Sequence, residues 1–229
     1  MSRLKWVVDQ SGGKLNIGSV HTIAAVDLSP PKAPANTLEQ LSRDAERYVL
    51  GNGQKTGYEY FFAYDIDNGD VVGRRTDGKT DSVGPGRARM ALEDPERRIL
   101  VTHNHPESTP PSLNDVAQFL LQPGRHTSVV LANDGSRYEM QPTGLLRDTL
   151  GAGELEIKSI VARLLARGFQ KIEAESVAKH ALWLALADVW QLRYNFKLSR
   201  GRGIFMDDAG TYLQDAVAYI RRSIQHTLR

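Results

Sequence analysis

The sequence predicts an α+β fold, with a mixed β-sheet flanked by helices and followed by a helical C-terminal appendage. Short apolar runs typical of strands recur between turn residues up to about residue 142. After Pro142-Thr-Gly144, helical spacing dominates and no convincing strand is visible. The 229 residues, of which 41% are hydrophobic and 24% charged, suffice for a substantial core.

The N-terminal part is expected to contain paired strands within residues 4–28, followed by a proline-rich break. A helix is expected from about Thr37 to Leu50, because Asn36 can cap it and Glu39 occupies the capping-box position. The glycines of Gly51-Asn-Gly53 are expected to end this helix.

The central part is expected to supply most of the sheet. The aromatic run from Tyr58 to Ile66 and the run from Asp70 to Arg75 flank a turn sequence, which predicts a hairpin. A short helix over about Arg87 to Glu93 precedes an apolar run from Arg98 to Thr102 that fits a buried strand. This strand would lead directly into His103, so that the two histidines begin a loop.

Ser112 can cap a further helix that extends to about Gln122. The segments Thr127 to Ala132 and Arg137 to Gln141 then predict a last hairpin. Three later segments show helical spacing, namely Leu155 to Ala166, Ala174 to Phe196 and Thr211 to Thr227. We therefore expect three parts: an N-terminal β segment at 1–35, a core at 36–144 and an α-helical extension at 145–229.

Composition excludes several classes of site. The chain has no cysteine, which rules out disulfides, thiolate metal ligands and a cysteine nucleophile. Its formal net charge of +2 is too small to indicate nucleic-acid or anionic-membrane binding by itself. No apolar run approaches the roughly 18 residues of a membrane span, and no signal peptide is evident. We expect a cytoplasmic protein that does not contact a membrane.

The most informative segment runs from His103 through His105 and Ser112 to Asp115. Residues two apart in an extended segment point to the same side, so both histidines can face one ion. Asp115, in the first turn of the next helix, can approach from across the loop. Two imidazoles and a carboxylate are ligands of catalytic zinc, which keeps a position for water. The alternative is a proline-stiffened surface loop with incidental histidines.

This arrangement of His103-x-His105-Pro followed by Ser112-x-x-Asp115 resembles the signature of the JAMM metalloprotease family, also called MPN or JAB domains. The His-Asn-His-Pro loop is particularly similar to prokaryotic members, including the RadC branch. Six residues separate His105 from Ser112 where many members have seven. The resemblance covers about residues 36–142 and implies a cytidine-deaminase-like MPN/JAB core.

Members of this family also have a glutamate at the start of a strand that precedes the metal loop, and Glu59 matches this position. A charged residue beginning an otherwise apolar strand is costly unless it is paired or functional, although a solvated strand end is the alternative. The resemblance implies zinc held by His103, His105 and Asp115. Glu59 would be the general base, and Ser112 would stabilise the oxyanion besides capping its helix.

The expected function is a zinc-dependent metallopeptidase or isopeptidase that cleaves an amide bond at the C-terminal tail of a ubiquitin-like protein or its conjugate. One alternative is a RadC-like or scaffold MPN module without peptidase activity, associated with DNA. Another is a JAB-type toxin, effector or phage-related peptidase. The expected partner is thus a protein or peptide. A basic segment with aromatic residues, from Arg193 to Arg202, indicates nucleic acid only weakly, because helix ends are commonly basic.

Overall fold

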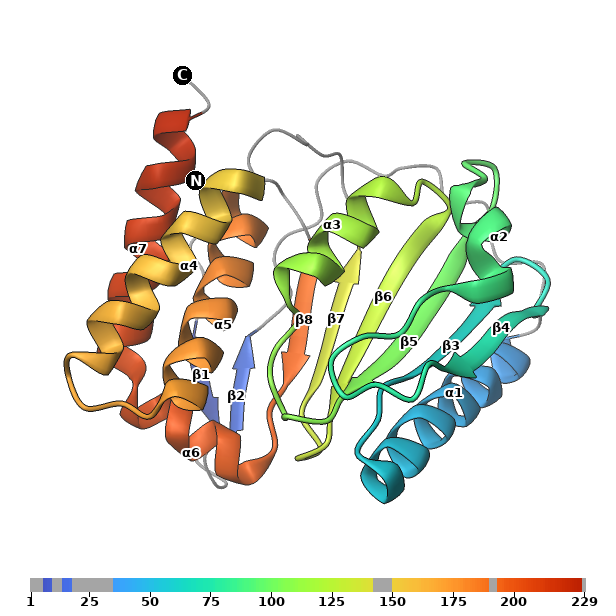
Figure 1. The fold of residues 1–229 in the computed structure, drawn as a ribbon, viewed down its shortest axis with the longest axis horizontal. Helices are drawn as coiled ribbons and strands as arrows, with labels where there is room; N and C mark the ends of the chain where they lie inside the picture. The colour runs from blue at the N-terminus through green and yellow to red at the C-terminus, as the bar shows by residue number, and fades with distance from the viewer. Residues whose placement is uncertain (1–5, 10–13, 18–34, 142–149, 190–192, 228–229) are drawn as a thin grey trace.

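The computed structural model describes residues 6–9, 14–17, 35–141, 150–189 and 193–227. Six strands form one sheet in the order β4-β3-β5-β6-β7-β8 (Figure 1). They are β3 (Tyr60–Asp65), β4 (Val71–Thr76), β5 (Ile99–His105), β6 (Arg125–Ala132), β7 (Arg137–Gln141) and β8 (Arg193–Lys197). β5 and β6 are parallel, whereas the other neighbours are antiparallel. The predicted α+β class, with a mixed sheet flanked by helices, is confirmed.

The described helices surround this sheet. They are α1 (Ala35–Thr56), the short 3-10 helix η1 (Gly86–Ala88), α2 (Arg89–Glu93), α3 (Leu113–Leu121), α4 (Leu150–Leu165), α5 (Lys171–Val189), α6 (Arg200–Asp208) and α7 (Gly210–Thr227). The strands β1 (Trp6–Asp9) and β2 (Lys14–Ile17) form a separate antiparallel hairpin, as predicted. The remainder of the predicted N-terminal strand region, at 18–28, lies outside the described residues. None of the described helices combines the length and apolar composition needed to cross a membrane.

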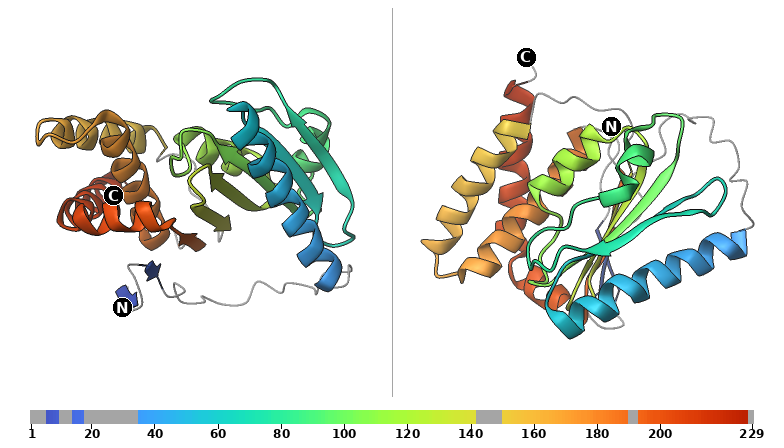
Figure 2. Two further views of the ribbon diagram at one scale, coloured as in Figure 1. Left: turned by 90° about the horizontal axis from the view of Figure 1, so that it is seen from below. Right: turned by 45° about the vertical axis from the view of Figure 1, so that its right-hand side comes forward.

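The sheet is covered on both faces. Helix α1 packs its Ala45 and Val49 against Phe62 and Val129 on one face. On the other face, η1 and α2 pack against Phe61, Ile99 and Val101 of β3 and β5. Helix α3 lies over the same second face, and the C-terminal helices α4, α5 and α7 lie beside its β8 edge (Figures 1 and 2). Phe119, Val130, Tyr138 and Trp183 share one core between them.

Helix α1 does not end at Gly51 and Gly53, as the sequence suggested, but continues to Thr56. Gly57 follows with a φ of 73°, the left-handed conformation that favours glycine. Gly53 instead permits close packing, because a Cβ there would lie 2.1 Å from Nδ2 of Asn104. The glycine therefore lets α1 approach the sheet.

Strand β5 is also longer than predicted and includes both histidines. Its parallel partner β6 extends equally far, so that His103 lies beside Val130 and His105 beside Ala132. The prediction that the two histidines begin a loop is wrong, because this neighbouring strand continues the hydrogen-bonded ladder to His105. The histidines are consequently held by the sheet.

The C-terminal part is not purely helical, which corrects a second prediction. Helix α5 ends at Val189, and residues 193–197 form β8, which pairs antiparallel with β7. Its sequence Arg-Tyr-Asn-Phe-Lys alternates polar and aromatic residues, a strand pattern that the surrounding helical spacing obscured. Helix α6 was not predicted either. Since β8 extends the main sheet, the C-terminal segment is a structural continuation of the core; the predicted boundary at 144 lies outside the described residues.

Candidate metal centre

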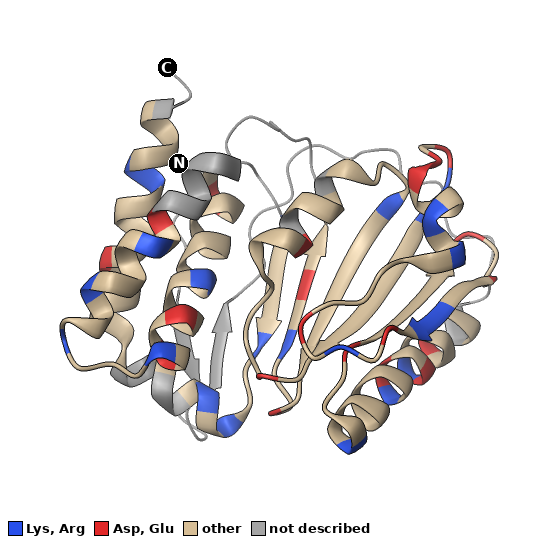
Figure 3. Ribbon diagram, in the orientation of Figure 1, with Lys and Arg blue, Asp and Glu red and all other residues tan. Residues whose placement is uncertain are grey.

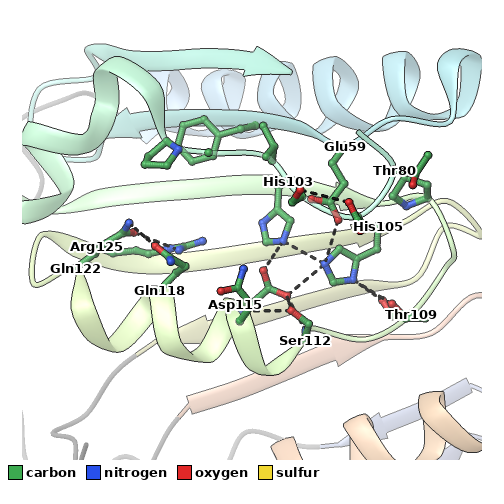
Figure 4. A pocket seen from close by; sticks show the side chains of 18 of the residues that line it. Glu59, Thr80, His103, His105, Thr109, Ser112, Asp115, Gln118, Gln122 and Arg125 are labelled. Carbon is green, nitrogen blue, oxygen red and sulfur yellow. Dashed lines mark hydrogen bonds and ion pairs between the residues drawn. The ribbon is translucent and has the colours of Figure 1, made fainter. Parts of the chain in front are cut away.

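The five residues singled out in the sequence lie around one point (Figure 4). His103 and His105 belong to β5, and their side chains lie on the sheet face that α3 covers. Asp115 lies in the first turn of α3, directly after the cap formed by Ser112. Glu59 immediately precedes β3, the antiparallel neighbour of β5. Two adjacent strands and one helix end thus bring together residues that are up to 56 positions apart in the sequence.

The three expected metal ligands have a spacing that suits one ion. Nε2 of His103 lies 3.3 Å from Nε2 of His105 and 2.9 Å from Oδ1 of Asp115. Nε2 of His105 lies 3.3 Å from Oδ2 of Asp115. Ligand atoms about 2.0 to 2.1 Å from a tetrahedral ion lie about 3.3 to 3.4 Å apart. The spacing of the three side chains therefore fits one metal ion, and the ligand group borders a cavity.

The surroundings of the imidazoles favour metal binding. Nδ1 of His105 lies 3.0 Å from the carbonyl oxygen of Thr109, which can only accept a hydrogen bond. When this ring is neutral, its proton is therefore on Nδ1, and Nε2 presents its lone pair to the site. Although burial acts in the opposite direction, the charges of Asp115 and Glu59 raise the pKa of His105. Burial lowers the pKa of His103, which keeps this ring neutral as a ligand must be.

Asp115 is held by the residue that caps its helix. The backbone N–H of Ser112 donates to Oδ2 of Asp115 at 2.6 Å, and the Ser112 hydroxyl donates to the same oxygen at 2.7 Å. Although burial opposes the charged carboxylate, both imidazoles hold the pKa of Asp115 well below its usual value. The predicted capping role of Ser112 is confirmed, since its Oγ also accepts a hydrogen bond from the Asp115 N–H.

Glu59 is buried beside the ligands and is not a solvated strand end. The residue is 7% exposed, and its Oε1 lies 3.9 Å from Nε2 of His105. Burial raises the pKa of Glu59 to about 7, although the charge of His105 acts in the opposite direction. A carboxyl group with such a pKa can exchange a proton near neutral pH.

Asn104 positions the backbone on both sides of Glu59, a role that the sequence analysis did not assign. Its Oδ1 accepts a hydrogen bond of 2.7 Å from the N–H of Tyr60, and its Nδ2 donates one of 3.1 Å to the carbonyl of Tyr58. Both neighbours of Glu59 are thereby fixed by one fully buried amide. A polar residue between two ligands on a buried strand was the signal available in the sequence.

The C-terminal segment contacts the loop between His105 and Ser112. The guanidinium of Arg202 donates hydrogen bonds to the carbonyl of Ser108 and to Oγ of Ser176, and it also binds Asp134. Tyr194, the first aromatic of the basic segment, is buried. Arg202 and Tyr194 therefore make their contacts within the fold. Basic and acidic side chains are interspersed over the described C-terminal helices (Figure 3).

The site opens into a cavity of about 670 Å³. Residues 80–85, between β4 and η1, line it on one side, and α3 lines it on the other. Glu59, His103, His105, Ser112 and Asp115 all contribute to its wall. A ligand in this cavity would therefore contact the metal ligands and the glutamate together.

Comparisons with protein-family models, curated proteins and solved structures each gave no match. The capacity of His103, His105 and Asp115 to bind a metal ion is inferred from the positions of their ligand atoms, which all lie within 4.8 Å of one another. Membership of a particular family is accordingly a proposal.

Proposed function

We propose that this chain is a zinc-dependent hydrolase of the JAMM type, with an MPN/JAB core, that cleaves a peptide or isopeptide bond in the cytoplasm. The observation that carries the proposal is the placement of Glu59 beside the three ligands His103, His105 and Asp115. Metallohydrolases need such a combination, in which protein ligands leave one metal position open and a carboxylate lies close to it.

A zinc ion held by these residues would supply a Lewis acid and a water molecule of lowered pKa. Glu59, with its pKa near 7, would accept a proton and deliver it to the leaving amine. Ser112 would redirect its hydroxyl from Asp115 to the oxyanion that develops on the scissile carbonyl. Asn104 would keep Glu59 in place during both proton transfers.

The proposed substrate is an extended polypeptide tail, that of a ubiquitin-like protein or its conjugate. The cavity between residues 80–85 and α3 supports this proposal, because it continues on both sides of the ligand group. An extended chain would pass between these two walls and bring its scissile carbonyl to the open metal position.

The test uses the purified full chain, loaded with zinc and incubated with ubiquitin-like proteins that carry a C-terminal peptide extension. Mass spectrometry of the products should show cleavage by the wild type and a loss of at least about 100-fold in rate for Glu59→Gln. Glu93→Gln is the matched control, since Glu93 lines the same cavity but is exposed. Zinc binding without any cleavage would instead indicate a metal-binding interaction module.

A further inference from the structure

Arg125 is a buried cation in the wall of the same cavity, and it has no part in the proposed hydrolysis steps. It is the first residue of β6, is 6% exposed and lines the cavity together with His103 and Asp115. Figure 4 shows it with Gln122 and Gln118 to one side of the ligand group. Arg125 therefore forms the end of the cavity next to α3.

The guanidinium of Arg125 contacts neutral partners. Nη1 donates to Oε1 of Gln122 at 3.3 Å, and Nη2 donates to Oγ of Ser128 at 3.0 Å. Nε is buried and has no hydrogen-bond partner, and no carboxylate of the described residues lies within ion-pair distance. Burial lowers the pKa of Arg125 to about 10, so the side chain remains charged at neutral pH.

A buried guanidinium is normally compensated by a carboxylate, because removing its charge from water is otherwise costly. The charge of Asp115 acts on Arg125 from a distance and favours its protonated form. Asp115 is also an expected metal ligand, so a bound zinc ion would offset the negative charge that acts on Arg125. With zinc bound, the charge of Arg125 would thus be left without a compensating anion in direct contact.

The neighbouring amides orient this end of the cavity. Gln122 uses its Oε1 to accept from Arg125, and its Nε2 donates to Oε1 of Gln118 at 3.0 Å. This chain of hydrogen bonds leaves the amide nitrogen of Gln118 as a further donor in the cavity wall. Donors on Arg125 and Gln118 together suit a ligand that only accepts hydrogen bonds, such as a carboxylate.

We propose that Arg125 is a specificity-determining residue that binds a substrate carboxylate, from either an acidic side chain near the scissile bond or a C-terminal carboxyl group. This inference rests on the proposed peptide hydrolysis for its substrate class. The carboxylate would contact the part of the Arg125 guanidinium that lines the cavity, and it would compensate this buried charge. Substrates without a carboxylate at that position would leave the guanidinium uncompensated.

The test measures binding of matched peptides to the full chain by calorimetry, with and without zinc. One pair is acetyl-Ala-Ala-Glu-Ala-Ala-amide and its glutamine counterpart; the other is acetyl-Ala-Ala-Ala with a free or an amidated C-terminus. At least one carboxylate peptide should bind about tenfold or more tightly than its neutral partner, and the responding pair identifies the source of the carboxylate. Arg125→Gln should remove the preference, whereas Glu93→Gln should retain it.

A second variant protects the test against misfolding of Arg125→Gln. In Gln122→Glu, a nearly isosteric change, the new carboxylate would pair with Arg125 and should abolish the preference while Arg125 is retained. Equal affinity for both members of each pair, including no measurable binding of any peptide, would overturn the proposal, as would a preference that persists in Arg125→Gln. A preference that depends on Arg125 without any cleavage would refute the hydrolase and leave the carboxylate site standing.

Discussion

The indole Nε1 of Trp183 donates a hydrogen bond of 2.8 Å to the carbonyl oxygen of Pro111. Trp183 is fully buried in α5, and Pro111 immediately precedes the Ser112 cap of α3. Because Asp115 lies in the first turn of α3, this bond connects the C-terminal helices to an expected metal ligand. The position of Asp115 therefore depends on a part of the chain that the motif does not include.

Replacing Trp183 by phenylalanine should weaken zinc binding about 10-fold, because Pro111 loses the donor that positions the start of α3. The free energy of unfolding should also decrease by about 1 to 3 kcal/mol, since the buried carbonyl is left without this partner. A zinc competition titration and chemical denaturation measure the two effects. Leu184→Ala, in the same buried helix, is the control: it should reduce stability while zinc affinity stays unchanged. Equal losses of zinc affinity in both variants would contradict the positioning role.

Asn104→Ala should reduce the catalytic rate of the zinc-loaded protein more than it reduces zinc content. The change removes the acceptor for the Tyr60 N–H and the donor for the Tyr58 carbonyl, so the backbone around Glu59 can shift. A loss of about 10-fold or more in kcat is expected, because the distance of a general base from its proton is critical. Metal analysis and turnover of the same samples separate the two quantities.

Gly53→Ala provides an independent check on the role of Asn104. The new methyl group would lie 2.1 Å from Nδ2 of Asn104, so this amide must move. The variant should therefore reproduce the kinetic defect of Asn104→Ala. Gly51→Ala is the control, since a Cβ at Gly51 meets no atom within 4 Å. Normal turnover by Gly53→Ala would show that Glu59 does not depend on this amide.

His180 should make the protein sensitive to acid. Burial lowers its pKa from 6.5 to about 3, so the unfolded chain takes up a proton at a higher pH than the folded chain. The stability associated with neutral His180 is complete above pH 6.5 and is lost as the pH falls toward about 3. The slope is up to about 1.4 kcal/mol per pH unit. Urea denaturation across this range should show a shallower pH dependence for His180→Asn than for the wild type; identical slopes would contradict it.

The sequence predicted the elements with strong local signals. Ser112 and Asp115 satisfy a capping box within four residues, and β3 and β4 are joined by a short turn, so local rules sufficed for both. The grouping of His103 and His105 was predictable because alternation along an extended segment places both side chains on the same side.

Features that depend on distant partners could not be predicted in this way. The extension of β5 to His105 depends on β6, and the need for a glycine at position 53 within α1 depends on the side chain of Asn104. Strand β8 is stabilised by pairing with β7, more than 50 residues earlier in the chain. Helical spacing on both sides obscured its short alternating pattern. Trp183 and Pro111 are also far apart in the sequence, so their hydrogen bond could not be predicted from local patterns.

Zinc stoichiometry tests the central claim most directly. The wild type, His103→Ala, Asp115→Asn and the control His126→Ala are equilibrated with zinc, freed of excess metal and analysed by plasma mass spectrometry. His126 is a suitable control because it is a half-buried histidine outside the ligand group. We predict one zinc ion per chain in the wild type and in His126→Ala, and a large loss in both ligand variants. A wild type without stoichiometric zinc, or a His103→Ala protein that retains it fully, would contradict the account.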